Sequence, residues 1–151
     1  MNFVIFLSLL TTISMAQTEK IKIHVLRLKP GQDVLKEVTG FVQTNKINAA
    51  SILSVVGSLS EAHFRFANNK EGVRLKGPFE VVSLSGTTGG EGSHIHLSVA
   101  DRKGTTLGGH LLEGNSVFTT LEIVLGEYPD LIFKRTLDST YGYKELEVQK
   151  K

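Results

Sequence analysis

Short apolar runs separated by turn-forming residues occupy most of this chain, and no other feature limits its fold so strongly. Clusters of Gly, Asn and Asp separate the runs, within which apolar and polar residues alternate or apolar residues predominate. Both patterns are typical of β-strands, and short turns between successive strands favour antiparallel pairing. The sequence therefore predicts a largely antiparallel sheet. The expected strands cover residues 21–28, 49–56, 62–67, 79–85, 94–100, 105–112 and 117–125, with a final pair at 131–137 and 143–148.

One segment has helical periodicity instead. Its apolar residues recur every three or four positions, and Asp33 stands before them as a candidate N-cap. A single helix packed against a largely antiparallel sheet is an α+β architecture. No internal repeat and no long linker divides the chain, so we expect one compact domain. The helical positions are Val34, Leu35, Val38, Phe41 and Val42.

The first sixteen residues have the pattern of a secretory signal peptide. An apolar core, Phe3 to Ile13, is followed by small residues that end at Ala16, where we expect cleavage. A membrane anchor is the alternative, but the apolar run is shorter than the roughly 20 residues that a helix needs to cross a bilayer. We therefore expect a secreted protein, with no membrane attachment after cleavage and a mature domain of residues 17–151.

Cysteine is absent from the chain, so disulfides cannot stabilise the exported domain. The 135 residues that remain after cleavage (151 minus 16) are enough to bury a core. Packing, a metal or oligomerisation must then supply the stability. The formal charge is only +2, and the basic residues are scattered along the sequence. Proteins that bind nucleic acids usually concentrate basic residues on one face, so we expect no nucleic-acid partner.

Three of the five histidines fall on one predicted β-hairpin. His94 and His96 are two residues apart on a strand and therefore share a face of the sheet. A bulged three-residue loop at 102–104 would place His96 opposite His110 and His94 opposite Leu112. All three imidazole rings would then converge.

Three neutral imidazoles with an open fourth position make a site suited to zinc or a similar divalent ion. The alternative is that these histidines are ordinary polar residues on the solvated face of a sheet. A four-residue loop, or a bulge at the glycine pair before His110, would turn that ring to the other face. Glu113 is a candidate fourth ligand, or a second-shell acceptor that orients a ligating histidine. His24 and His63 have no such neighbours, so we expect structural roles for them.

Several segments of the chain, in order, resemble the plants and prokaryotes conserved (PPC) domain family. They are RLKPG at 27–31, GSLSEA at 57–62, GPFEVVSLSG at 77–86, HIH at 94–96 and GGHLLEG at 108–114. The likeness runs from about residue 23 to residue 138, and it implies a compact α+β subunit that assembles as a homotrimer. Some stand-alone members of this family look like metal-site proteins, with ligands at the histidines that match His94, His96 and His110.

Two departures separate this chain from the plant members of the family. It lacks the Arg-Gly-Arg-Pro hook through which such proteins enter the minor groove of A·T-rich DNA. Pro78 also stands where the plant members commonly have an arginine. Together with the predicted export signal, these departures argue against a nuclear role.

Three functions are compatible with these features. The preferred hypothesis is a secreted homotrimeric module that binds a divalent metal, zinc above all, at His94, His96 and His110, and a small molecule or protein through that site. An alternative is a metal-dependent hydrolase or lyase that uses the same histidines, with Glu113 or Glu122 as base. A third is a purely structural oligomerisation domain. No cysteine nucleophile, Gly-x-Ser-x-Gly motif or phosphate-binding loop is present, so we assign no catalytic residue.

Overall fold

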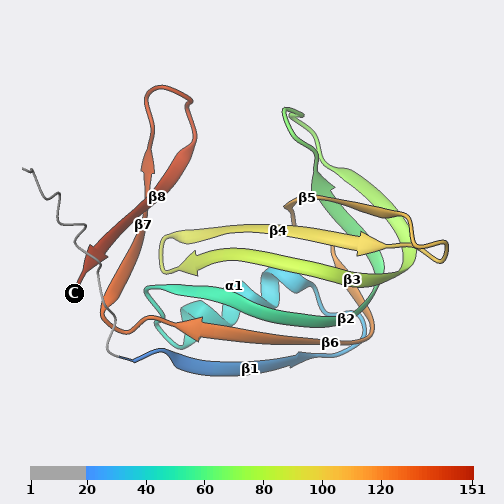
Figure 1. Ribbon diagram of the computed structural model, residues 1–151, viewed down its shortest axis with the longest axis horizontal. Coiled ribbons are helices and arrows are strands. Elements are labelled where there is room, and N and C mark those ends of the chain that lie inside the picture. Colours follow the sequence, from blue (N-terminus) through green and yellow to red (C-terminus); the bar gives the residue numbers. More distant parts are fainter. Residues whose placement is uncertain (1–19) are drawn as a thin grey trace, which may run out of the picture.

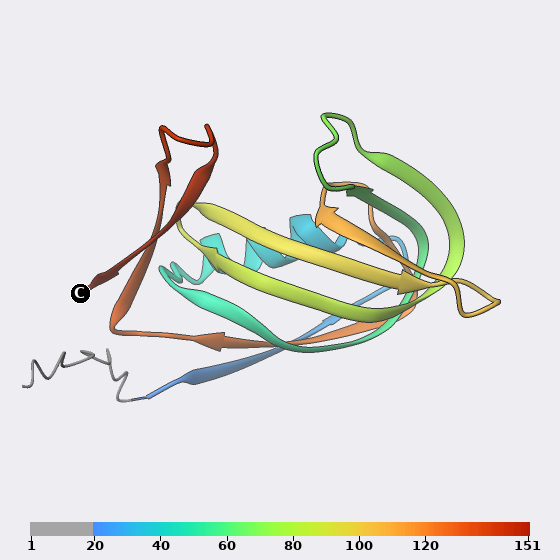
Figure 2. The same ribbon diagram turned by 45° about the horizontal axis from the view of Figure 1, so that its top comes forward.

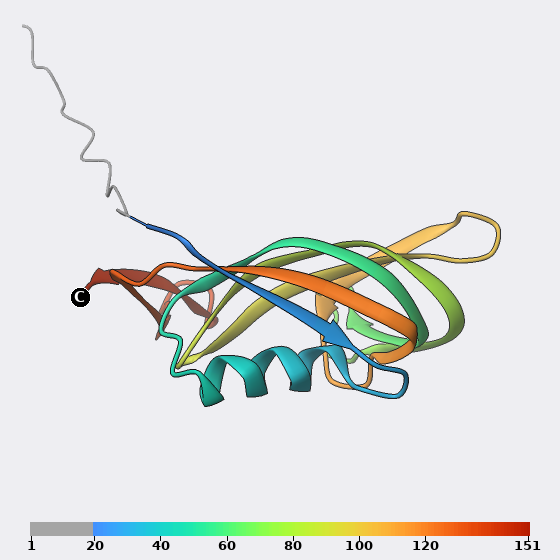
Figure 3. The same ribbon diagram turned by 90° about the horizontal axis from the view of Figure 1, so that it is seen from below.

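The computed structural model describes residues 20–151, so the predicted signal peptide lies outside the described residues. Within this range six strands form one antiparallel sheet in the order β1-β6-β2-β3-β4-β5, and α1 lies against one face of it (Figures 1 and 3). The predicted single-domain α+β fold is confirmed. The elements are β1 (Lys22–Leu28), α1 (Val34–Thr44), β2 (Ala50–Arg65), β3 (Val73–Gly89), β4 (Gly92–Ala100), β5 (Thr106–Leu111), β6 (Ser116–Glu127), β7 (Leu131–Leu137) and β8 (Lys144–Lys150). A search of residues 20–151 finds no helix with the length and hydropathy of a membrane span.

The helix α1 begins where the sequence predicts it. The Asp33 carboxylate accepts a hydrogen bond from the backbone N–H of Lys36 at 2.9 Å, as an N-cap side chain does. The same carboxylate accepts bonds from the N–H groups of Gly114 and Asn115, the latter at 2.9 Å. Asp33 therefore also ties the start of the helix to the turn that follows β5.

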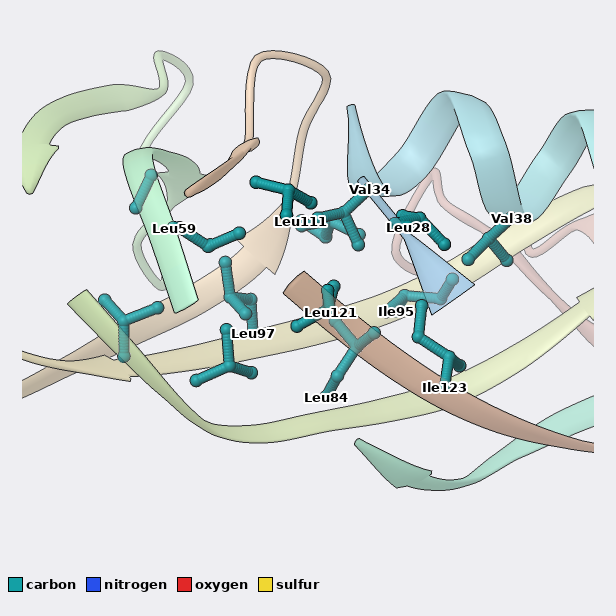
Figure 4. Packing of buried hydrophobic residues seen from close by; sticks show 14 of the residues in the cluster. Leu28, Val34, Val38, Leu59, Leu84, Ile95, Leu97, Leu111, Leu121 and Ile123 are labelled. Atoms are coloured by element: carbon teal, nitrogen blue, oxygen red, sulfur yellow. The ribbon is translucent and has the colours of Figure 1, made fainter. Parts of the chain in front are cut away.

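Side chains from α1 and from the inner face of the sheet form one hydrophobic core (Figure 4). Val34 and Val38 of the helix pack with Leu28, Ile95 and Ile123 of the strands, and each of these five is at most 3% exposed. Burying an aliphatic side chain of this kind contributes about 1.5–3 kcal/mol. Because side chains alternate along a strand, burial of Ile95 turns its two neighbours on β4 to the opposite face.

Strand β2 runs without interruption through Gly57, where the sequence pattern predicts a break between two strands. A Cβ at Gly57 would collide with the Thr120 carbonyl oxygen of β6, and the φ angle of Gly57 is +142°. This glycine permits the close approach of β6 and a register shift, and it does not end the strand. Strand β3 is likewise longer than the predicted 79–85, because its first half, from Val73, pairs with the second half of β2.

The last two strands form the hairpin that the sequence predicts, apart from the six-stranded sheet (Figure 2). We call β7, β8 and the loop between them the terminal hairpin. Phe133 attaches it to the domain: its side chain is 7% exposed, and its N–H donates to the Asn48 carbonyl oxygen at 3.0 Å. Figures 1 and 2 show the terminal hairpin standing at the end of the sheet where β3 turns into β4.

Candidate metal centre

Strands β4 and β5 pair in the register that the sequence predicts, with His96 opposite His110. The loop between them is the expected three-residue turn. In it the Asp101 N–H donates to the Thr105 carbonyl oxygen at 3.0 Å, and Gly104 has a φ of +80°. The Asp101 carboxylate also accepts two hydrogen bonds from backbone N–H groups of the loop. The four-residue loop and the bulge at the glycine pair, the two alternatives, are therefore wrong.

One detail of the predicted pairing is also wrong. After His110, strand β5 leaves β4 and pairs with the end of β2, where Arg65 lies opposite His110. The N–H of Leu112 then donates to the His63 carbonyl oxygen at 3.2 Å, so His94 does not face Leu112. The consequence for the site is that His110 has β4 on one side and Arg65 of β2 on the other.

The rings of His94, His96 and His110 converge on one face of the hairpin. Their centroids are 5.1 to 5.7 Å apart, and one ring nitrogen from each lies within 4.8 Å of the other two. The Nε2 atoms of His94 and His96 are separated by 3.2 Å. Two nitrogens bound to one tetrahedral zinc lie about 3.3 Å apart, because each Zn–N bond is about 2.0–2.1 Å long. The first two histidines thus already have the spacing of metal ligands, and a ring nitrogen of the third lies within 4.8 Å of both.

The surroundings of the cluster favour neutral imidazoles. Burial lowers the pKa of His94, and the nearby His96 and Arg135 lower it further. Burial also lowers the pKa of His110, with further contributions from His94 and Arg65. A neutral imidazole is the form that coordinates a metal, so at neutral pH both rings are in the ligating state.

A cleft of about 410 Å³ opens beside the cluster, and His94 and His110 form part of its wall. Arg65 and the β3–β4 turn also line the cleft. The remaining lining residues, Arg135 and residues 143–145, belong to the terminal hairpin. Sequence reasoning missed Arg65 and the residues of the terminal hairpin. They are far from the histidines along the chain, and only the pairing of β2 with β5 and the docking of the terminal hairpin bring them to the site, so no local pattern could reveal them.

Glu113 is not part of this cluster. Its carboxylate is largely exposed and lies 3.4 Å from the Nζ atom of Lys36 on α1, while its backbone carbonyl accepts a hydrogen bond from Nδ1 of His63. Glu122, the other candidate base, is exposed on β6, which β2 and β3 separate from β4. Neither carboxylate therefore reaches the three histidines.

The remaining histidines lie outside the cluster. His63 is bonded at the turn after β5, and Nε2 of His24 lies 2.7 Å from the Glu127 carboxylate. Burial raises the pKa of Glu127, but the hydrogen bond with His24 and the Lys22 ammonium outweigh it, and the net shift is downward. The structural roles expected for these two histidines agree with their placement.

The chain is similar to one protein family and to several curated proteins. The family model described as the Plants and Prokaryotes Conserved (PCC) domain matches residues 15–129. Among curated proteins, the bifunctional protein GlmU of Synechococcus sp. (strain JA-3-3Ab) is 41% identical over 88% of this chain and 21% of its own length. A second GlmU, from Synechococcus sp. (strain JA-2-3B'a(2-13)), is 43% identical. The chain spans about a fifth of the length of these curated relatives.

Solved structures share the fold. A hypothetical protein from Salmonella enterica has a TM-score of 0.85 and 42% identity, over 87% of this chain and 96% of that one. A metal-containing protein from Archaeoglobus fulgidus has a TM-score of 0.72 and 27% identity, over 88% and 99% of the two chains. A protein from Bacteroides thetaiotaomicron, named as a candidate DNA-binding protein, has a TM-score of 0.75 over 85% and 96%, but at 21% identity its likeness concerns the fold alone.

Proposed function

The chain belongs to the Plants and Prokaryotes Conserved (PCC) domain family, and on this basis we propose that it is a binding module that holds one divalent metal ion, zinc or a similar ion, through His94, His96 and His110. The convergence of three ring nitrogens within 4.8 Å of one another carries the proposal. Donor chemistry supports it, because three neutral imidazoles suit such an ion and leave one coordination position for a ligand. The description of the Archaeoglobus relative as a metal-containing protein supports it as well.

Metal analysis of the purified mature protein tests this proposal. After incubation with zinc and removal of the unbound ion, we expect about one ion per chain, because one set of three imidazoles makes one site. Chelation should then lower the thermal unfolding midpoint, because an ion that binds only the folded state stabilises it. The proposal is wrong if the protein retains no ion and its midpoint is the same with and without zinc.

The outer face of the sheet supports assembly as a homotrimer, which the family resemblance implies. Val25 of β1 is 72% exposed and Val56 of β2 is 59% exposed, although the residues next to them, Leu26 and Val55, pack against the core. Monomers rarely leave a broad apolar surface open to water, so a second and third copy are the partners we propose for this face. Its other members, each about half exposed, are Ile23, Leu53 and Val82.

A charge placed on this face tests the trimer. Val56→Asp should convert a trimer into a monomer, because burying an unpaired carboxylate in an apolar interface is strongly unfavourable. Sedimentation equilibrium of metal-free protein measures the mass. Val148→Asp is the matched control, because Val148 is 51% exposed but lies on the terminal hairpin. A wild-type chain that sediments as a monomer contradicts the proposal.

Export and the absence of a nucleic-acid partner also remain proposals. The pattern of residues 1–16 supports export, and a mature N-terminus at Gln17 in the secreted fraction would test it. The low and scattered positive charge supports the absence of a nucleic-acid partner. The description of the Bacteroides fold neighbour as a candidate DNA-binding protein points the other way. Salt-sensitive binding of this protein to duplex DNA would therefore overturn the proposal that it has no nucleic-acid partner.

A metal-dependent hydrolase or lyase is the second candidate function. One observation favours it: two carboxylates, Glu91 and Glu145, line the cleft beside His94 and His110. A carboxylate near the open position of a metal could take a proton from a bound water. Zinc-dependent ester hydrolysis that falls in a Glu145→Gln variant would support this function over a binding module.

A further inference from the structure

The cleft beside the three histidines has more positive than negative charge on its walls. Arg65, Arg135 and Lys144 contribute three cationic groups, and Glu91 and Glu145 contribute two anionic groups. Three neutral imidazoles bring no negative charge to a divalent ion, so a bound ion would keep its full charge. A cationic cleft of this kind favours an anion as its occupant.

We propose that the metal centre and Arg135 together bind a small molecule through its carboxylate group. This inference rests on the proposed metal function and names the ligand class for that site. One carboxylate oxygen would occupy the open coordination position, and the guanidinium of Arg135 would pair with the carboxylate from the side of the terminal hairpin. Arg65 would add a second positive charge beside His110.

Arg135 is anchored next to the cluster. Its Nη2 atom donates to the Thr87 Oγ1 atom at 2.7 Å, and Thr87 lies opposite His94 in the pairing of β3 with β4. The Arg135 backbone N–H also donates to the Glu91 carboxylate at 3.3 Å. Both contacts tie the terminal hairpin to the β3–β4 hairpin, which carries His94.

The bonding capacity of Arg135 is only partly used. Its Nε atom is buried and has no hydrogen-bond partner. Among the ion pairs within 4.0 Å found in residues 20–151, none involves Arg135 or Arg65. A buried donor without an acceptor is unfavourable, and a ligand oxygen that entered beside the guanidinium would supply one.

Arg65 flanks the cluster from the other side. It lies opposite His110 in the pairing of β2 with β5, and its Nη1 atom donates to the Asn69 carbonyl oxygen at 3.1 Å. The two guanidinium groups therefore reach the cleft from different elements, one from β2 and one from β7. A planar guanidinium matches the two oxygens of a carboxylate, which a single ammonium does not.

The size of the cleft limits the ligand to a small molecule. Its volume of about 410 Å³ lies near the lower end of the roughly 300–1,000 Å³ usual for small-molecule sites. The Tyr143 side chain forms part of the wall, so the ligand can carry an apolar or aromatic group beside its carboxylate. A simple aromatic carboxylate such as benzoate is therefore a suitable probe.

Cobalt-loaded protein allows metal binding and ligand binding to be measured separately. Cobalt(II) replaces zinc in sites of this kind, and its visible absorption spectrum changes when a ligand enters the coordination sphere. We expect benzoate to shift the spectrum of the wild-type protein with a saturating dependence, and inorganic phosphate to be the weaker ligand. Arg135→Gln should weaken benzoate binding about tenfold or more, because a charge-assisted hydrogen bond is lost.

Two other variants complete the experiment. Arg27→Gln is the matched control, because Arg27 is exposed on β1 and bonds Thr120 far from the cleft, and its benzoate affinity should equal that of the wild type. Arg65→Gln should weaken binding as well, and it replaces Arg135→Gln if that variant fails to fold.

The outcomes separate the two proposals. A wild-type protein that takes up no cobalt contradicts the metal site itself. A protein that binds cobalt but shows no spectral change with benzoate, or that responds only to phosphate, contradicts the carboxylate inference alone. Unchanged benzoate affinity in both folded arginine variants contradicts it too.

Discussion

A chain that carries both His96→Ala and His110→Ala is expected to lose its divalent metal. Two of three donor nitrogens would be gone, and one imidazole on a solvated strand binds such ions only weakly. We expect the zinc affinity to fall by more than about 100-fold, because removal of a residue that merely orients a ligand already costs about 10–100-fold. Equilibrium dialysis followed by elemental analysis measures the effect.

His63→Ala is the matched control for this variant. His63 lies outside the cluster and is bonded at the turn after β5, so its loss should leave zinc affinity unchanged. A double variant that still binds one ion per chain with wild-type affinity would place the ion elsewhere.

Acidification should release the metal from the wild-type site, because a protonated imidazole cannot coordinate an ion. The pKa values of His94 and His110 lie below the usual value, so these two rings begin to take up protons at a lower pH than an ordinary histidine does, and zinc content measured by dialysis across a pH series follows the release.

A methyl group added at position 86 is expected to destabilise the fold severely. Gly86 has a φ of +148°, and a Cβ there would collide with the His94 carbonyl oxygen and lie 2.7 Å from the Ile95 Cα atom. Strain at an unfavourable φ costs about 1–3 kcal/mol, and overpacking costs about as much again. Gly86→Ala should therefore lower the free energy of unfolding by about 2–6 kcal/mol.

The same substitution in the helix should have the opposite effect. Gly40 lies in α1, and a methyl group added there would meet no other atom within 4 Å, so Gly40→Ala should stabilise the protein by about 0.5–1 kcal/mol. Urea unfolding of both variants in the presence of a chelator measures the contrast without a contribution from metal. If Gly86→Ala is as stable as the wild type, the close crossing of β3 and β4 does not constrain this position.

The hairpin that carries the histidines could be predicted because its determinants are local. Strand alternation placed His94 and His96 on one face, and the Asp101–Gly104 turn set the pairing with His110. Asp33 was recognisable for a similar reason, because an N-cap is defined by the residues beside it. Interactions between neighbours in sequence leave a pattern that can be interpreted without coordinates.

The features that could not be predicted depend on contacts between distant segments. Taken from the sequence alone, Gly57 indicates the end of a strand. Only the approach of Thr120 on β6 explains why a glycine stands there while β2 continues. Glu113 is close to His110 in sequence, but its carboxylate lies beside a lysine of α1 and not in the cluster. Arg135 reaches the cleft only because the terminal hairpin folds back onto the β3–β4 turn.

The terminal hairpin begins at residue 131, just after the family model's match ends at residue 129. The three histidines lie within the matched residues, while Arg135 and Tyr143 lie after them on the terminal hairpin. Sequence changes in that hairpin would alter one wall of the cleft and leave the strands that carry the histidines as they are. Exchange of this one C-terminal segment between homologues is thus a direct route to altered selectivity.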